Sequence, residues 1–589
     1  MRSRFMATAT AAVVLAGVAG VGGSVAAQAS AAEAAAPTKA KNVIYLLGDG
    51  MGRTHVTAAR ERFYGAHGKL NMETMPAVGQ VATYAVDKNS GQPGEADFHP
   101  NYVTDSASAA TAWSSGVKTY NAALGVDAKG AVVPTVMEQA HAAGLATGNV
   151  STAEITDATP AGQMSHALAR GCQGPSYSAG SCQDLAITGS ALPTDDVRVT
   201  PIADQIARNQ TADVILGGGL SRFDAADQTA LENNGYAVLG SPASQTVATK
   251  TDLANATGQK VFGLFNKGNL TVEKFKKANP GAPEAQEPTV ADMTTKAISL
   301  LKAKSAASGN KGFYLQVEGA LIDKRSHAND ASQTLEEMKA FDDAVKVALD
   351  FAKQDGNTLV IVTADHECAG FNIIEKGSFT NAEAGTPPVN VDGGNPSNSS
   401  TPPRSSNQAK DPARSDFAPA TFRTADDPAG VVDGTPQASL WLTYLSGNHT
   451  GADVPVFAYG PGSSALEGSI ENTALFRIVR GALSLDGSGD PDPVTTATKT
   501  SLSGPAKART GKKATAKVTV KVAVSPSAAT GTVRITDKGK VVKTVALSGG
   551  KATVKLTLKK GKHKLVASYA GSTSYKPSAS ATITIRVVR

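Results

Sequence analysis

Carboxylate and imidazole side chains recur in short polar motifs along the chain. Asp323 and His327 stand four residues apart, so a helix would place them one turn apart, where both can reach one metal ion. Asp365 and His366 are adjacent and follow an apolar run, and Asp49 lies in a glycine-rich segment that follows another. Taken singly, each motif is also compatible with a turn, an ion pair or a solvated histidine.

Ser106 is a candidate nucleophile. It stands in the motif Thr104-Asp105-Ser106-Ala107, before a run of small residues suited to a helix. A serine or aspartate in this position is commonly an N-cap. The same helix N-terminus attracts anions, so a serine there would face an anion site.

These motifs indicate more when they are taken together. Three of the nine histidines lie in acid-rich or glycine-rich surroundings, and the chain offers oxygen and nitrogen ligands for more than one divalent ion. No Walker A or Rossmann glycine pattern competes with this interpretation. The candidate ligands are Asp49, Glu318, Asp323, His327, Asp365, His366 and His449.

The elements that would position these residues alternate between strands and helices. Helical patterns at 134–143 and 331–353 lie among short apolar runs typical of buried strands. This alternation predicts an α/β fold, a three-layer α/β/α sandwich around a mostly parallel sheet, with polar clusters at the carboxyl ends of the strands. The predicted strands are 42–47, 146–150, 214–216, 312–317 and 358–362.

Composition divides the chain into further parts. Residues 495–589 carry 20 Lys or Arg and one acid, Asp537, whereas the preceding 494 residues carry a net charge of −13. We therefore expect a catalytic domain at 37–486, a linker at 487–498 and a second domain at 499–589. Apolar alternation with a period of two predicts a small all-β sandwich there. Within the catalytic domain, residues 375–437 are rich in Pro, Gly, Asn, Ser and Thr, which predicts a long loop or lid with little core.

The N-terminus has the features of an export signal. Arg2 and Arg4 precede an uncharged stretch, and Ala29-Ser30-Ala31 offers a cleavage site, which predicts a signal peptide at 1–31. A membrane anchor is the alternative, but the stretch has a single Leu among Ala, Gly and Val. We expect a secreted, extracellular protein with no membrane span in its mature form.

Three cysteines fit an exported protein with little disulfide content. Cys172 and Cys182 enclose a short polar segment, which is compatible with a local disulfide. Cys368 is then left over, and it is interpreted as a buried free thiol, with metal ligation as the alternative.

The combined motifs resemble the bacterial alkaline phosphatase family over about residues 41–485, and residues 499–589 resemble bacterial immunoglobulin-like domains. The order and rough spacing of six motifs carry the first resemblance. These motifs are 48–52, 104–107, 148–160, 316–327, 363–366 and 449–451.

The resemblance implies two Zn²⁺ and one Mg²⁺ as cofactors. Their ligands would be carboxylate, imidazole and hydroxyl side chains. By ion, the implied ligands are Asp323, His327 and His449 for the first zinc, Asp49, Asp365 and His366 for the second, and Asp49, Thr159 and Glu318 for magnesium.

The resemblance also implies how phosphate is handled. Ser106 would be the nucleophile, and Arg170 would hold two non-bridging phosphate oxygens with its guanidinium fork. Asp157 and Lys324 match the family variant that carries Asp and Lys beside magnesium and phosphate. The pair Cys172–Cys182 resembles a family disulfide.

We therefore expect a phosphomonoesterase that acts through a phosphoserine on Ser106. A phosphodiesterase or another hydrolase of the same metalloenzyme superfamily is the alternative, and a cell-surface binding protein is a second. A sulfatase would need a Pro two residues after its nucleophile, where this chain has Ser108. Expected partners are small phosphomonoesters and phosphate, an anionic cell-wall polymer bound by the basic C-terminal domain, and a second copy in a homodimer.

Overall fold

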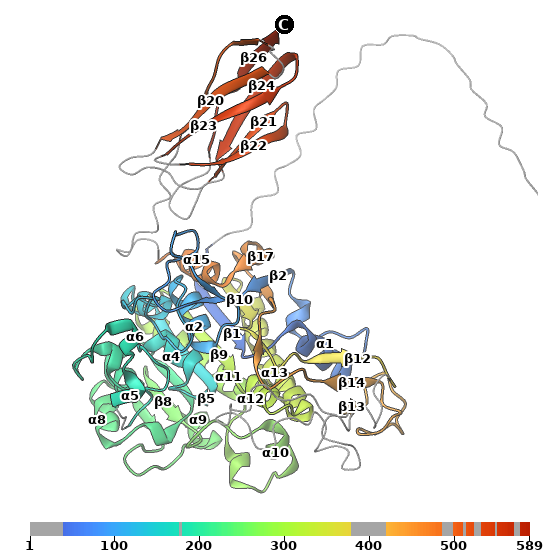
Figure 1. The fold of residues 1–589 in the computed structure, drawn as a ribbon. Helices are drawn as coiled ribbons and strands as arrows, with labels where there is room; N and C mark the ends of the chain where they lie inside the picture. The colour runs from blue at the N-terminus through green and yellow to red at the C-terminus, as the bar shows by residue number, and fades with distance from the viewer. Residues whose placement is uncertain are drawn as a thin grey trace, which may run out of the picture. The chain divides into compact units, whose positions relative to one another are not determined.

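The computed structural model describes residues 39–175, 179–377 and 420–485, and, near the C-terminus, 499–509, 514–523, 532–547, 550–569 and 578–588. The predicted signal peptide, the predicted linker and residues 378–419 of the predicted insertion lie outside the described residues. The described residues form an α/β domain and a small β domain (Figure 1).

A ten-stranded sheet forms the centre of the α/β domain. The strands from β10 to β7 in spatial order run parallel, and β16 is antiparallel to both β10 and β2. Every residue of β1 and β10 is buried, as expected for strands covered on both faces. In spatial order the strands are β17 (Gly468–Glu471), β2 (Ala77–Ala82), β16 (Val454–Tyr459), β10 (Thr358–Thr363), β1 (Asn42–Gly48), β9 (Phe313–Gly319), β5 (Ala146–Glu154), β6 (Val214–Gly218), β8 (Val261–Leu264) and β7 (Ala237–Leu239).

Helices cover both faces of this sheet, which confirms the predicted α/β/α sandwich (Figure 1). On one face α11 (Val290–Ala307) and α13 (Ala331–Asp355) contact each other and the central strands. On the other lie α2 (Ser106–Ser115), α3 (Val136–Ala142), α4 (Ala158–Met164) and α15 (Asn472–Ala482). Further helices are α7 (Ile202–Asn209), α8 (Ala225–Asn233), α9 (Lys250–Asn255) and α10 (Glu273–Ala278).

Small residues let α2 pack deep in the domain. All ten of its residues are buried, and most are Ala or Ser. A Cβ atom added at Gly162 of α4 would lie 2.6 Å from the Cβ atom of Ala110, so the close approach of α2 and α4 requires glycine there. This packing fixes the start of α2, where Ser106 stands.

The predicted loop at 375–437 is partly wrong. Its last described part contains β13 (Ala420–Phe422), which pairs with β14 (Leu440–Thr443), itself paired with β12 (Asn372–Ile374). Ala420 and Phe422 are buried, and Arg62 forms a two-pronged ion pair with Asp433. Composition predicted a loop because strands of three residues depend on distant partners that leave no local pattern.

The C-terminal domain consists of two small sheets around its own core, as predicted. One sheet has the order β18 (Lys499–Ser503), β20 (Ala514–Ala523), β23 (Lys551–Leu558). The core side chains include Ile535, Leu556 and Leu565. The other sheet contains β19 (Lys507–Arg509), β26 (Ile583–Val588), β24 (Gly561–Tyr569), β21 (Thr532–Asp537), β22 (Lys540–Ala546) and β25 (Ser578–Ala579).

The described residues also show the state of the cysteines. Cys172 and Cys182 form a disulfide, as predicted, and Cys368 is a buried free thiol. Among the described helices, none has both the length and the apolar character that a membrane crossing requires.

Candidate active site

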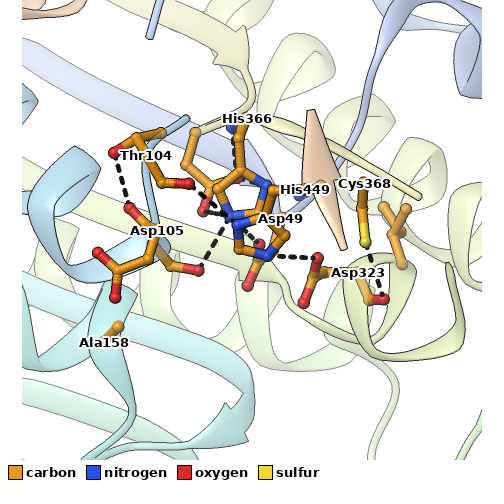
Figure 2. Close-up of polar contacts among 12 residues, drawn as sticks. Asp49, Thr104, Asp105, Ala158, Asp323, His366, Cys368 and His449 are labelled. Carbon is orange, nitrogen blue, oxygen red and sulfur yellow. Dashed lines mark hydrogen bonds and ion pairs between the residues drawn. The ribbon is translucent and has the colours of Figure 1, made fainter. Parts of the chain in front are cut away.

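Polar side chains gather where the central parallel strands end. Strands β1, β5, β9 and β10 lie in parallel register, so their carboxyl ends meet at one edge of the sheet. Asp49 directly follows β1, and Asp365-His366 closely follows β10. Helix α12 (Leu321–His327) begins just after β9 and carries Asp323. Figure 2 shows side chains of this edge converging on one small volume.

Ser106 lies at the centre of this group. It is the first residue of α2, and Asp105 is the N-cap, whose carboxylate accepts a hydrogen bond from the Ser108 amide. The Ser106 Oγ atom is buried and lies 3.1 Å from His366 Nε2. The positive end of a ten-residue helix is therefore directed toward the serine oxygen.

Two histidine lone pairs face each other beside Asp323. His327 Nδ1 donates to the Gly447 carbonyl at 2.5 Å, and His449 Nδ1 donates to the Thr104 carbonyl at 3.0 Å. Because a carbonyl only accepts, both Nδ1 atoms carry a proton, and in the neutral form of each ring the lone pair is at Nε2. Those two Nε2 atoms are 3.1 Å apart, and Asp323 Oδ2 lies 3.2 Å from His327 Nε2. A cation between them would satisfy all three groups.

A second group of anions surrounds Asp49. Burial, and next the Asp365 carboxylate, raise the pKa of Asp49 well above its ordinary value. Asp49 Oδ1 has no hydrogen-bond partner among the described residues, although it lies 3.6 Å from His366 Nε2. Asp365 is better satisfied, because its Oδ1 accepts hydrogen bonds from the amides of Gly50 and His366. Buried carboxylates so close together call for a metal ion to balance their charge.

Gly50 allows these two groups to approach each other. Its φ of +69° lies in the left-handed region that favours glycine. A Cβ atom at this position would also lie 2.8 Å from Asp323 Oδ1 and 2.8 Å from Cys368 Cβ. The segment between Asp49 and α1 (Arg53–Tyr64) therefore has to contain glycine for steric reasons.

Glu318 forms a third anionic position. It is buried near the end of β9, where burial raises its pKa to about 8 although the Ser151 hydroxyl lowers it. The Ser151 hydroxyl donates a hydrogen bond to Glu318 Oε2. Thr159, in the first turn of α4, is also buried and lowers the pKa of Glu318 through its hydroxyl. Oxygen ligands of this kind suit a hard cation such as Mg²⁺.

Asp157 links two cations at the rim of the site. Its Oδ2 lies 2.8 Å from Lys324 Nζ, and its Oδ1 lies 2.7 Å from a terminal nitrogen of Arg170. Burial raises the pKa of Asp157, but these two partners outweigh it and hold the pKa well below its usual range. Arg170 also contacts Asp105 Oδ2 at 3.1 Å, so its guanidinium lies between the serine helix and α4.

The structure thus brings all twelve sequence-predicted site residues to one edge of the sheet. The sequence interpretation missed the contact of Asp105 with Arg170 and the contact of Ser151 with Glu318. The sequence predicts Asp105 only as a helix N-cap. No local pattern indicated Ser151, because its partner is 167 residues away.

Cys368 remains compatible with both of its interpretations. It is buried and free, and its Sγ atom lies 3.8 Å from the Asp323 carbonyl. A ligand atom from each of Asp323, His327 and His449 also lies within 4.8 Å of the Cys368 sulfur.

Comparisons with known proteins identify families for both parts of the chain. The family model "Alkaline phosphatase" matches residues 40–485, and "Bacterial Ig-like domain (group 3)" matches residues 500–588. The alkaline phosphatase of Escherichia coli K12 is 37% identical over 470 residues, covering 76% of this chain and 86% of that relative. Streptomycin-6-phosphate phosphatase of Streptomyces griseus is 35% identical, covering 78% and 94%.

Solved structures give the same result. The crystal structure of a cold-active alkaline phosphatase from a psychrophilic Shewanella species superposes with a TM-score of 0.52 at 26% identity. That match covers 75% of this chain and 99% of the Shewanella chain. The family match, the sequence identity and the shared fold show that this chain belongs to the alkaline phosphatase family, and the cluster of acids and histidines around Ser106 fits that family.

Proposed function

We propose that the protein is a secreted alkaline phosphatase that hydrolyses phosphomonoesters to an alcohol and phosphate through a phosphoserine on Ser106. The observation that carries the proposal is the position of Ser106 Oγ. It lies at the N-terminus of α2, beside His366 and close to the guanidinium that Asp105 and Asp157 hold. A nucleophile and an anion-binding group are therefore adjacent.

The residues present fit the implied metals. The Nε2 atoms of His327 and His449 meet beside the buried Asp323 carboxylate, and the buried Asp49 Oδ1 has no hydrogen-bond partner among the described residues. We infer that Asp323, His327 and His449 would hold one Zn²⁺ and that Asp49, Asp365 and His366 would hold the other. Asp49, Thr159 and Glu318 would hold Mg²⁺. When bound, such ions stabilise the charge that develops on the attacking and leaving oxygens.

The chain's own residues would position the phosphate. Arg170 would bind two non-bridging oxygens with its fork, because Asp105 and Asp157 hold the guanidinium at two of its corners. Lys324, whose pKa is raised by Asp157 against the effect of burial, remains a cation beside it. Ser106 Oγ then forms a bond to phosphorus as the alcohol oxygen leaves, and water later releases phosphate from Ser106.

Hydrolysis of p-nitrophenyl phosphate tests this proposal. We expect release of p-nitrophenol that a chelator abolishes and that Zn²⁺ with Mg²⁺ restores. The diester bis-p-nitrophenyl phosphate should react far more slowly, because the cationic pair of Arg170 and Lys324 suits a dianionic monoester. Preference for the diester would instead support the phosphodiesterase alternative. The name of the Streptomyces relative makes streptomycin 6-phosphate a further substrate to include.

Export and assembly complete the proposal. The predicted signal peptide supports secretion, and N-terminal sequencing of protein from the culture medium should begin near residue 32.

A homodimer is the expected assembly by family resemblance, and light scattering measures it directly. Residues 495–589 contain 20 basic residues and one acid, and this positive charge supports retention of the enzyme on an anionic cell-wall polymer.

A further inference from the structure

One face of the C-terminal domain exposes only hydroxyl and lysine side chains along a strand. In β23 the residues alternate strictly in burial after Ala552, with Val554, Leu556 and Leu558 buried in the domain core. The intervening side chains are exposed, and they are Lys551, Thr553, Lys555 and Thr557. Strand β18 continues this pattern, because Lys499, Ser501 and Ser503 are exposed while Thr500 and Leu502 are buried.

The register of the sheet aligns lysines across strands. Lys551 lies directly opposite Lys521 of β20, and Lys555 lies directly opposite Lys517. Between these pairs Thr553 lies opposite Thr519, and their hydroxyls are 3.3 Å apart. Two lysine pairs therefore flank a pair of threonines in the ladder.

Such pairing is unfavourable for the isolated domain. Residues directly opposite each other have Cβ atoms about 5 Å apart, and like charges there destabilise a sheet. None of the three strands contains an acidic residue. The single acid of this part of the chain, Asp537, belongs to the other sheet and binds His563 and the Lys564 amide. Lys551 and Lys555 are exposed and have no ion-pair partner among the described residues, so both are open to an external anion.

We propose that the face of β18, β20 and β23 is the binding surface for a linear phosphodiester-linked polyol polymer. This inference rests on the proposed retention of the enzyme on an anionic polymer, but it does not depend on the phosphatase reaction. Lys551 and Lys555 are four residues apart, which is about 13 Å along a strand, so one extended chain would meet cations at intervals. Thr553 lies between them, and Ser503 of β18 lies in the same row through Thr519, so their hydroxyls offer hydrogen bonds to phosphate and polyol groups.

The chemistry of this face favours that polymer over other polyanions. Its exposed described side chains include no aromatic ring, so bases of single-stranded nucleic acid would find nothing on which to stack. They also include no apolar group that could enter a lipid surface. Lysine and hydroxyl groups are sufficient to bind a polymer whose only charged groups are phosphates.

Binding of the full-length protein to immobilised poly(glycerol phosphate) tests this inference. The double variant Lys551→Ala/Lys555→Ala should bind at least ten-fold more weakly at low salt. Its slope of log affinity against log salt should fall in magnitude by about 1 to 1.5, because each phosphate contact with a flexible strand contributes about 0.7. The variant Lys551→Arg/Lys555→Arg should bind like the natural protein.

A matched control removes the same charge from the other sheet. Lys540 and Lys543 are exposed on β22, and the variant Lys540→Ala/Lys543→Ala should bind within three-fold of the natural protein. All variants should hydrolyse p-nitrophenyl phosphate at the same rate, so a failure of the phosphatase proposal would be seen separately. Equal loss in the two Ala variants would overturn the assignment of this face. So would preferential binding to a single-stranded DNA of equal phosphate number or to phosphatidylglycerol vesicles.

Discussion

At the scale of single residues, the rim of the site depends on carboxylates that each hold more than one group. Asp157 is shared by Lys324 and Arg170, and Arg170 is shared by Asp157 and Asp105. The guanidinium is thereby held before a substrate arrives, which reduces the entropy lost when phosphate binds. Its pKa is raised by the two carboxylates, although burial opposes them, so it stays charged at alkaline pH.

Replacing Arg170 by Ala should weaken inhibition by phosphate and lower kcat/KM for p-nitrophenyl phosphate. The expected loss is about 1–3 kcal/mol, the range for hydrogen bonds to charged groups. The matched control is Arg208→Ala, because Arg208 of α7 also pairs with two aspartates, Asp204 and Asp227, but outside the site. An unchanged inhibition constant in the Arg170 variant would show that this arginine does not contact phosphate.

Residues were predictable where chemistry and position coincide in a short motif. Asp49 and His366 follow apolar runs, so the sequence alone could place them at strand ends, and the four-residue spacing of Asp323 and His327 could place those two on one helical turn. Ser151 and Asp105 were not predictable as site residues, because each acts on a partner brought near only by the fold. A local window shows neither the distance nor the orientation of such pairs.

At the scale of elements, a partly buried ion pair connects α3 to the segment that follows α4. His166 Nε2 lies 2.9 Å from Glu138 Oε1, and His166 Nδ1 lies 2.8 Å from the Gly125 carbonyl. Both acceptors require a proton on the ring, so the folded state favours the charged imidazolium. Burial lowers the pKa of His166, but the contacts with Glu138 outweigh it and the pKa is raised.

The stability of this connection should depend on pH. Because the pKa of His166 is raised on folding, its contribution is complete below the unfolded value of about 6.5 and is lost as pH rises through the folded value. His166→Gln should therefore lower the free energy of unfolding by about 1–2 kcal/mol at pH 6 and by much less at pH 10. Chemical denaturation at both pH values measures this.

Glu138→Gln provides the companion variant, because it removes the other half of the same pair. The two single changes and the double change should show non-additive losses at pH 6. Equal losses for His166→Gln at pH 6 and pH 10 would mean that the pair is not an ion pair in solution.

Long, regular elements were the predictable part of the fold. The runs at 42–47 and 358–362 are apolar except for Asn42 and Thr358 at their starts, and both form fully buried central strands. The helical pattern at 331–353 predicted α13 within two residues. In the structure Asp330 caps the start of this helix, and Gly356 adopts the left-handed conformation at its end. The short strands β12 and β13 were missed because pairing, not local preference, makes them strands.

At the scale of the whole molecule, the described residues form two separate main hydrophobic cores, in parts of the chain whose net charges are opposite. One core unites the central sheet and its helices, and the other belongs to residues of the C-terminal domain. The anionic cluster at Asp49, Asp323 and Asp365 belongs only to the first. Metal ions that bind the folded cluster stabilise that core by mass action and leave the other unaffected.

Calorimetry should therefore show two unfolding transitions of which a chelator shifts one. Removing metal should lower the Tm of the catalytic domain by several degrees, because buried carboxylates then repel one another. A chain truncated after residue 490 should keep its turnover and lose only the transition that the chelator does not move. A single transition that shifts as one unit would contradict independent cores.

The most direct test of the central claim is covalent labelling of Ser106. Incubating the full chain with ³²P-labelled phosphate at acid pH, followed by denaturation and peptide mapping, should place the label on the peptide that contains Ser106. The variant Ser106→Ala should incorporate none and should lose several orders of magnitude in turnover, while its metal content stays unchanged. Label recovered from the Ser106→Ala variant, or from another residue of the natural chain, would contradict the account.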